Sequence, residues 1–269
     1  MSRPSTGERL GHLVRRECEV ARQALAASGS VHGRVHEARK AIRRARSALA
    51  LVEKRLDIGS ADRTLQRVGD SLSSLRDAHA TVETLARVDE LDGGDRWAPA
   101  MATLRAHADQ VAVVVQGGDP GFAWRQRAIA RATAQLAGLP WKTVKPAHLR
   151  EGLGRQSARV ERSVARARKS PTPENIHRWR RRARRLRMQL EAVAKLEERR
   201  LQVDAQQPKK LRRLADELGW YQDIQALMQL VRRLPDVPER AALAARLDEL
   251  LGQCQVEPVS VHKLPEPPA

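Results

Sequence analysis

Breaker residues divide this chain into short, regular segments, and this division limits the possible fold more than any other feature. The breaks fall at SGS (28–30), DIGS (57–60), DGGD (92–95), GGDPG (117–121), GLP (138–140), KP (145–146), SPTP (170–173), QQP (206–208) and PDVP (235–238). The segments between them are rich in Ala, Leu, Arg, Glu and Gln, which favour helices. VAVVV at 111–115 is the one run that could indicate a strand, but ATLRAHADQ leads into it without a break, so we expect a helix end. The sequence therefore predicts an all-α fold.

Three helix starts carry recognisable signals. Two are capping boxes, in which an N-cap side chain and an acid three residues later each bond a free backbone amide. The third is an N-cap residue followed by proline in the first turn. The three starts are Ser5 with Glu8, Asp236 with Glu239, and Thr172 with Pro173.

A basic motif occurs twice, as HEARKAIRRAR at 36–46 and HRWRRRARRLR at 177–187. A shift of 141 residues matches His36 with His177, Arg39 with Arg180, Lys40 with Arg181, Arg43 with Arg184, Arg44 with Arg185 and Arg46 with Arg187. Downstream, LQRVGDSLSSLRD at 65–77 aligns with LRRLADELGWYQD at 211–223, pairing Arg67 with Arg213, Asp70 with Asp216 and Asp77 with Asp223. We therefore predict a duplicated unit of several helices, with its seam near residues 138–146.

Both basic segments are predicted to be amphipathic helices. At ~100° per residue, the cationic side chains share one face, opposite an apolar stripe that can pack in a bundle. The apolar stripes are Val35, Ala38, Ile42, Ala45, Leu49 and Val52 in the first segment, and Trp179, Ala183, Leu186, Leu190 and Val193 in the second.

The cationic faces are unusual because solvated helix faces normally mix charges of both signs. Residues 177–187 contain seven arginines and no acid. The whole chain has a formal charge of +18, which indicates nucleic acid, an anionic membrane face or another polyanion as the partner. One Tyr and one Phe accompany five Trp, fewer aromatic residues than a base-stacking surface normally has.

The two histidine helices resemble those of the CHAD family, the conserved-histidine α-helical domain. The resemblance lies in VHEARKAIRRARSALALV and IHRWRRRARRLRMQLEAV, in the downstream LRDAHATVETL and LGWYQDIQALMQL, and covers roughly residues 5–253. It implies two antiparallel four-helix bundles related by a pseudo-twofold axis, at 5–137 and 138–253, with the basic helices facing a central groove. It also implies inorganic polyphosphate as the ligand and association with polyphosphate granules. The sequence departs from the family pattern at Gln222, where the first half has Arg76.

The arginine rows suit a phosphate polymer, because the planar guanidinium donates two parallel hydrogen bonds to one phosphate. The predicted polyphosphate-binding residues are His36, Arg39, Lys40, Arg43, Arg46, Arg67, Arg155, Arg159, His177, Arg180, Arg181, Arg184, Arg187, Lys210 and Arg213. The alternative interpretation of the arginine rows is a solvated basic face without a specific ligand. Arg155 and Arg159 fit that alternative about equally well, because Glu161 lies nearby.

Metal binding and catalysis are not expected at these residues. No carboxylate or thiol shares the helix faces of His36 and His177, so both are expected to donate hydrogen bonds to phosphate, more strongly when protonated. Asp77 and Asp223 are expected to orient arginines rather than act as general bases. His12, His32, His79, His107, His148 and His262 are expected to be ordinary surface or core histidines.

The leading hypothesis is a non-enzymatic polyphosphate-binding protein without a cofactor, acting as a scaffold or targeting domain. A nucleic-acid binder is the runner-up, and a polyphosphate-cleaving enzyme is a weaker third, since no nucleophile with an oriented base is found. Neither a secretory signal nor an apolar run of the ~20 residues that a membrane span requires is found. Cys18 and Cys254 match no metal or redox spacing, so a cytoplasmic protein is expected. The segment 254–269 has four prolines and is expected to be a flexible tail.

Overall fold

The computed structural model describes residues 4–198, 201, 204 and 206–254. Its elements are α1 (Thr6–Ala26), α2 (Val31–Leu49), α3 (Gly59–Ser71), α4 (Ser73–Leu91), α5 (Ala98–Gly118), η1 (Pro120–Phe122), α6 (Ala123–Ala137), η2 (Trp141–Thr143), α7 (Pro146–Lys169), α8 (Pro173–Ala194), α9 (Gln206–Arg233) and α10 (Arg240–Gln253). The described residues contain no strand, so the all-α prediction is confirmed. The predicted tail beyond Cys254, with His262, lies outside the described residues.

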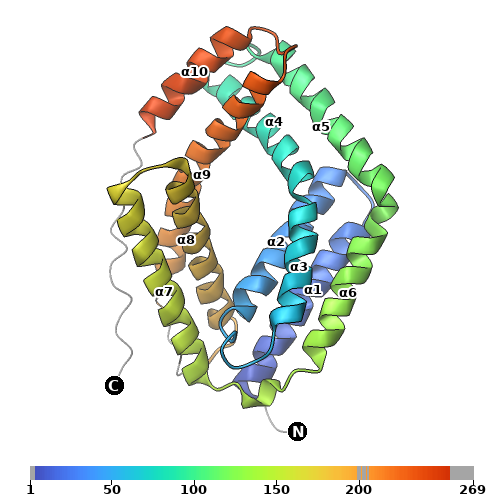
Figure 1. Ribbon diagram of the computed structural model, residues 1–269, viewed down its shortest axis with the longest axis vertical. Helices are drawn as coiled ribbons and strands as arrows, with labels where there is room; N and C mark the ends of the chain where they lie inside the picture. Colours follow the sequence, from blue (N-terminus) through green and yellow to red (C-terminus); the bar gives the residue numbers. More distant parts are fainter. Residues whose placement is uncertain (1–3, 199–200, 202–203, 205, 255–269) are drawn as a thin grey trace.

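The helices form an elongated frame (Figure 1). Helices α1, α2, α3 and α6 pack together along one side, and α7, α8 and the first part of α9 form the other. At one end α2 packs against α8, and at the opposite end α4 and α5 meet the last part of α9 and α10. No described helix is both long enough and apolar enough to span a bilayer.

The hydrophobic core at the α4–α9 end draws on both predicted halves of the chain. Leu85 of α4 and Leu104 of α5 are fully buried there against Leu227 and Val231 of α9 and Leu247 of α10. A helix pair from residues 5–137 thus shares one core with a helix pair from 138–253. The pseudo-twofold relation and the division into two bundles stay predictions.

Two of the three predicted helix starts are confirmed. The hydroxyl of Ser5 accepts from the backbone amide of Glu8 at 3.3 Å, and the Glu8 carboxylate accepts from the Ser5 amide at 2.8 Å. The hydroxyl of Thr172 accepts from the backbone amide of Asn175 at 3.3 Å, and Pro173 follows in the first turn of α8. The predicted box at Asp236 and Glu239 is wrong: Glu239 itself precedes α10, with a φ of 52° and no side-chain capping bond. Burial of Val237 in the α4–α9 core fixes this loop instead.

The sequence did not predict the break between α3 and α4. The chain bends at Leu72, which is fully buried, whereas the matching part of the second half continues as the single helix α9. At the bend, two backbone carbonyls accept hydrogen bonds from arginine side chains. Arg39 donates to the carbonyl of Gly69, and Arg125 donates to the carbonyl of Ser71. VAVVV at 111–115 lies inside α5, as expected.

Packing between α2 and α8 brings the two basic helices together. Both predicted apolar stripes are buried, which confirms the amphipathic interpretation. The helices touch near their C-terminal ends, where the Gln189 amide donates to the backbone carbonyl of Ser47 at 3.1 Å and the Ser47 hydroxyl lies 3.6 Å from the Met188 sulfur. From this crossing they diverge toward their N-terminal ends (Figure 1). The cationic side chains one and two turns before the crossing therefore lie between the helices.

Candidate anion-binding site

Arg43 and Arg184 lie close together, one on each basic helix. Burial, followed by the neighbouring charges of Arg184 and Arg39, lowers the pKa of Arg43 to about 9. Burial likewise lowers the pKa of Arg184 to about 10, assisted by Arg180. Nε of Arg43 is buried without a hydrogen-bond partner. Across the described residues, neither guanidinium has an acidic partner, so two like charges face each other uncompensated.

Arg39 and Arg180 flank this pair one helical turn earlier, and each is held by the backbone of a neighbouring helix. Arg39 donates to the carbonyl of Gly69 on α3. Arg180 donates from Nε to the carbonyl of Ala215 on α9 at 3.2 Å, and from Nη1 to the Gln222 side chain at 2.9 Å. The two carbonyls occupy matching positions in the predicted repeat. These contacts fix the guanidiniums without neutralising their charge.

The two repeat aspartates act on the same flanking arginines. Asp223 lies 3.7 Å from Nη1 of Arg180, and burial raises the pKa of Asp223 although that arginine opposes the shift. The charge of Asp77 raises the pKa of Arg39 and partly offsets the effect of burial. The orienting role expected for the aspartates agrees with the ion pair of Asp223.

Arg76 is a member of the site that was not among the predicted binding residues. Its charge contributes to the lowered pKa of Arg39, Arg43 and Arg180. The predicted repeat places Gln222 at the matching position, where its side chain contacts Arg180. The predicted repeat thus pairs Arg76 with an uncharged residue, so the matched cations of the two halves do not include it. Its position directly before Asp77 was the available signal.

The two motif histidines stand at the wider, N-terminal side of the site. Burial lowers the pKa of His36, as do Arg76 and Arg43. Burial also lowers the pKa of His177, whose Nδ1 lies 3.3 Å from Oε1 of Gln222, and Arg181 and Arg180 add to the shift. Both rings keep solvent access, as imidazoles that donate to a polyanion would require.

Other predicted binding arginines have acidic partners. The closest N···O approaches are 2.8 Å for Arg46–Asp62, 2.9 Å for Arg187–Glu191, 3.1 Å for Arg159–Glu53 and 3.9 Å for Arg155–Glu151. Lys40 pairs with Glu37 at 3.2 Å on an exposed surface. These ion pairs offset part of the positive charge around Arg43 and Arg184.

The remaining predicted cations are exposed. Arg181 lies on α8 beside His177, whereas Arg67 is on α3, and Lys210 and Arg213 are on α9. Their side chains make no hydrogen bond or ion pair within the described ranges. No hydrogen bond or ion pair in the described part of the chain joins the last three to the arginines between α2 and α8, so their role stays a prediction.

The family model described as the CHAD domain matches residues 8–232, most of the chain. The chain belongs to the CHAD domain family. No curated protein matches this CHAD domain. Two solved structures are similar to it, each at 20% identity. The CHAD domain from the plant Ricinus communis has a TM-score of 0.69 and is matched over 95% of this chain and 89% of its own. PptA from Streptomyces chartreusis has a TM-score of 0.66 and is matched over 93% of this chain and 94% of its own. At this identity the likeness concerns the fold.

The cationic surface of this CHAD domain can donate many hydrogen bonds to an anion. We define the α2–α8 arginine cluster as Arg39, Arg43, Arg76, Arg180 and Arg184. The Cβ atoms of arginines four residues apart on one helix lie ~5–6 Å from each other. Each guanidinium can grip a phosphate through two parallel N–H groups. The arrangement is therefore suited to an anion with several closely spaced phosphoryl groups.

Proposed function

We propose that this CHAD domain binds inorganic polyphosphate across the α2–α8 arginine cluster. The observation that carries the proposal is the close approach of Arg43 and Arg184 without an acidic partner among the described residues. An unpaired cation removed from water is costly, and a second cation beside it adds repulsion. A polyanion lying between α2 and α8 supplies the missing counter-charge to both arginines.

Binding then follows from the way in which each arginine is held. Arg39 and Arg180 are oriented by backbone carbonyls before the ligand arrives, so little side-chain freedom is lost when they engage phosphate. When Arg43 and Arg184 bind phosphate, the repulsion between their charges is relieved, and both side chains donate charged hydrogen bonds. His36, Lys40, His177 and Arg181 extend the basic surface toward the N-terminal ends of both helices, along which a longer polymer continues.

The proposed role is binding rather than catalysis. The cluster consists of cations that stay protonated at neutral pH, and such groups position phosphate but do not take up a proton from an attacking water. Association with polyphosphate granules in the cytoplasm, as a scaffold or targeting domain, belongs to the same proposal. Incubation of the protein with polyphosphate should therefore release no orthophosphate over time.

A nucleic acid is the second candidate ligand, because a formal charge of +18 attracts any polyanion. The structure offers few aromatic faces for base stacking. Trp97, Trp141 and Trp179 are buried in the core, and the rings of Trp124 and Trp220 are covered by Arg125 and Arg87. The preference for polyphosphate over nucleic acid therefore depends on how closely the phosphate groups of each polymer are spaced where it contacts the cluster.

A competition experiment tests the proposal. Fluorescent long-chain polyphosphate is bound to the full chain at moderate salt and challenged with unlabelled polyphosphate, DNA, RNA or pyrophosphate at equal total charge. We expect unlabelled polyphosphate to displace the probe at a much lower concentration than either nucleic acid. Stronger displacement by DNA or RNA would favour the nucleic-acid function. Salt dependence is expected with every polyanion and does not discriminate between them.

A further inference from the structure

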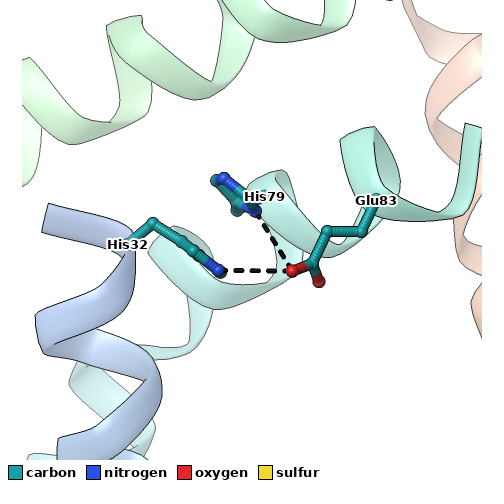
Figure 2. Close-up of side chains that lie close together, drawn as sticks. All are labelled: His32, His79 and Glu83. Carbon is teal, nitrogen blue, oxygen red and sulfur yellow. Dashed lines mark ion pairs between the residues drawn. The ribbon is translucent and has the colours of Figure 1, made fainter. Parts of the chain in front are cut away.

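Two histidines and a glutamate meet beside the arginine cluster, where the sequence indicated no shared site. His32 is in the first turn of α2, while His79 and Glu83 lie one turn apart on α4 (Figure 2). Nε2 of His32 lies 3.4 Å from Oε1 of Glu83, and Nδ1 of His79 lies 3.8 Å from the same oxygen. The imidazole rings are stacked, with centroids 3.2 Å apart and planes 12° from parallel. Side chains 47 residues apart in sequence thus converge on one carboxylate.

We propose that His32, His79 and Glu83 form a binding site for a divalent transition-metal ion of the zinc class. Two imidazole nitrogens and one carboxylate oxygen are a donor set that zinc accepts, with a fourth position left for water or another ligand. The inference does not depend on the polyphosphate-binding function.

The spacing of the donor atoms fits this assignment. Metal–ligand bonds of ~2.0–2.2 Å in a tetrahedron place ligand atoms about 3.4 Å apart. The three donor atoms lie within 4.8 Å of one another, and the two separations to Glu83 Oε1 are 3.4 and 3.8 Å. The two separations to the Glu83 oxygen are therefore close to those in a tetrahedral metal site.

One donor atom of the cluster has no hydrogen-bond partner, and the carboxylate is held in place. Nδ1 of His79, one of the three donor atoms, is buried and makes no hydrogen bond. The other oxygen of Glu83 lies 3.4 Å from Nη1 of Arg76, which holds the carboxylate with Oε1 toward the imidazoles. The positive charge of Arg76 weakens ion binding but leaves the geometry favourable. Side-chain exposures of 23% for His32, 35% for His79 and 50% for Glu83 let an ion enter from solvent.

Titration of the full chain with zinc chloride tests the site, in buffer free of phosphate and polyphosphate. Isothermal titration calorimetry should show one ion per chain, and Co²⁺ in its place should produce the visible absorption of a tetrahedral complex. His79→Ala and the near-isosteric Glu83→Gln should each weaken binding by at least about tenfold. His107→Ala, on α5, is the matched control and should bind as the wild type does.

Thermal melts show whether the variants fold and whether the cluster is only a packing contact. Metal that binds the folded state raises the melting temperature, so zinc should stabilise the wild type and His107→Ala but not His79→Ala. The proposal is wrong if the wild type neither binds zinc nor gains stability from it. Binding that persists unchanged in both His79→Ala and Glu83→Gln would place the ion elsewhere and equally overturn it.

Discussion

Arg43 and Arg184 show how a binding residue can be costly to the free protein. Their positions in the motif were apparent from the sequence, because both lie on cationic helix faces that recur after 141 residues. Their lack of acidic partners was not apparent, since Arg46, Arg159 and Arg187 belong to the same rows and yet are paired. The acids that pair Arg46 and Arg159 come from other segments of the chain, and only the fold brings them together.

Replacing Arg184 by glutamine should stabilise the free protein. The pKa of Arg184 in the folded state, about 10, lies below its usual value, so keeping the group charged costs stability throughout the range below pH 10. Removal of the charge should increase the free energy of unfolding by on the order of 1 kcal/mol, raising the melting temperature by ~2–4 °C. Arg187→Gln, which breaks the pair with Glu191, is the control and should not stabilise. A lower melting temperature for Arg184→Gln without polyanion would contradict the account.

Protonation of His177 should couple polyphosphate binding to pH. In the free protein, burial and the charges of Arg180, Arg181 and Arg184 lower its pKa, although the Gln222 side chain on α9 opposes the shift. A bound polyanion raises that pKa, so the contribution is complete below the free-state pKa and lost as pH rises through the bound-state pKa. Affinity should therefore be higher at pH 6 than at pH 8, and less so in His177→Gln. An identical pH dependence for wild type and variant would remove His177 from the mechanism.

At the scale of elements, the position of the Arg180 side chain over α9 depends on a glycine. A Cβ at Gly219 would lie 2.6 Å from Nη2 and 3.1 Å from Cζ of Arg180. The guanidinium lies directly over the α9 backbone there and reaches the Ala215 carbonyl. The repeated spacing predicted both helices, but nothing in the sequence indicated that the arginine packs on this glycine.

Gly219→Ala should weaken polyphosphate binding without unfolding the protein. The new methyl group displaces the flexible end of Arg180, whereas alanine favours the helix by up to ~1 kcal/mol relative to glycine. Loss of an oriented charged hydrogen bond of ~1.5–3 kcal/mol should reduce affinity about tenfold or more in a fluorescence titration. The control is Gly154→Ala on α7, whose Cβ would meet no atom within 4 Å. Equal affinity of the two variants would show that the position of Arg180 is unimportant.

At the scale of the whole molecule, a shared hydrophobic core joins the two predicted halves, residues 5–137 and 138–253. Helix segments and the faces they bury were predictable from local periodicity, so the all-α class and the apolar stripes of α2 and α8 were correct. The joint core of α4, α5, α9 and α10 was not predictable, because pairing between distant helices leaves no local pattern. The same reason hid the cluster of His32, His79 and Glu83 from the sequence.

A fragment that ends at residue 137 should not fold as a stable monomer. It would expose Leu85, Val88, Trp97 and Leu104, which the last part of α9 and α10 help to bury in the full chain. We expect it to aggregate or to melt without cooperativity, as followed by size-exclusion chromatography and circular dichroism. A monomeric fragment with a cooperative transition would instead support two independently folding bundles.

Charge reversal at a matched number of positions tests most directly whether the α2–α8 arginine cluster is the polyphosphate site. Arg43→Glu with Arg184→Glu lowers the formal charge of +18 by the same amount as Arg105→Glu with Arg127→Glu, at exposed positions of α5 and α6. Both double variants are titrated with fluorescent polyphosphate at one salt concentration, after circular dichroism confirms their helices. We predict loss of binding only in the first. Equal weakening in both would show that net charge alone attracts the polymer and would contradict a defined site.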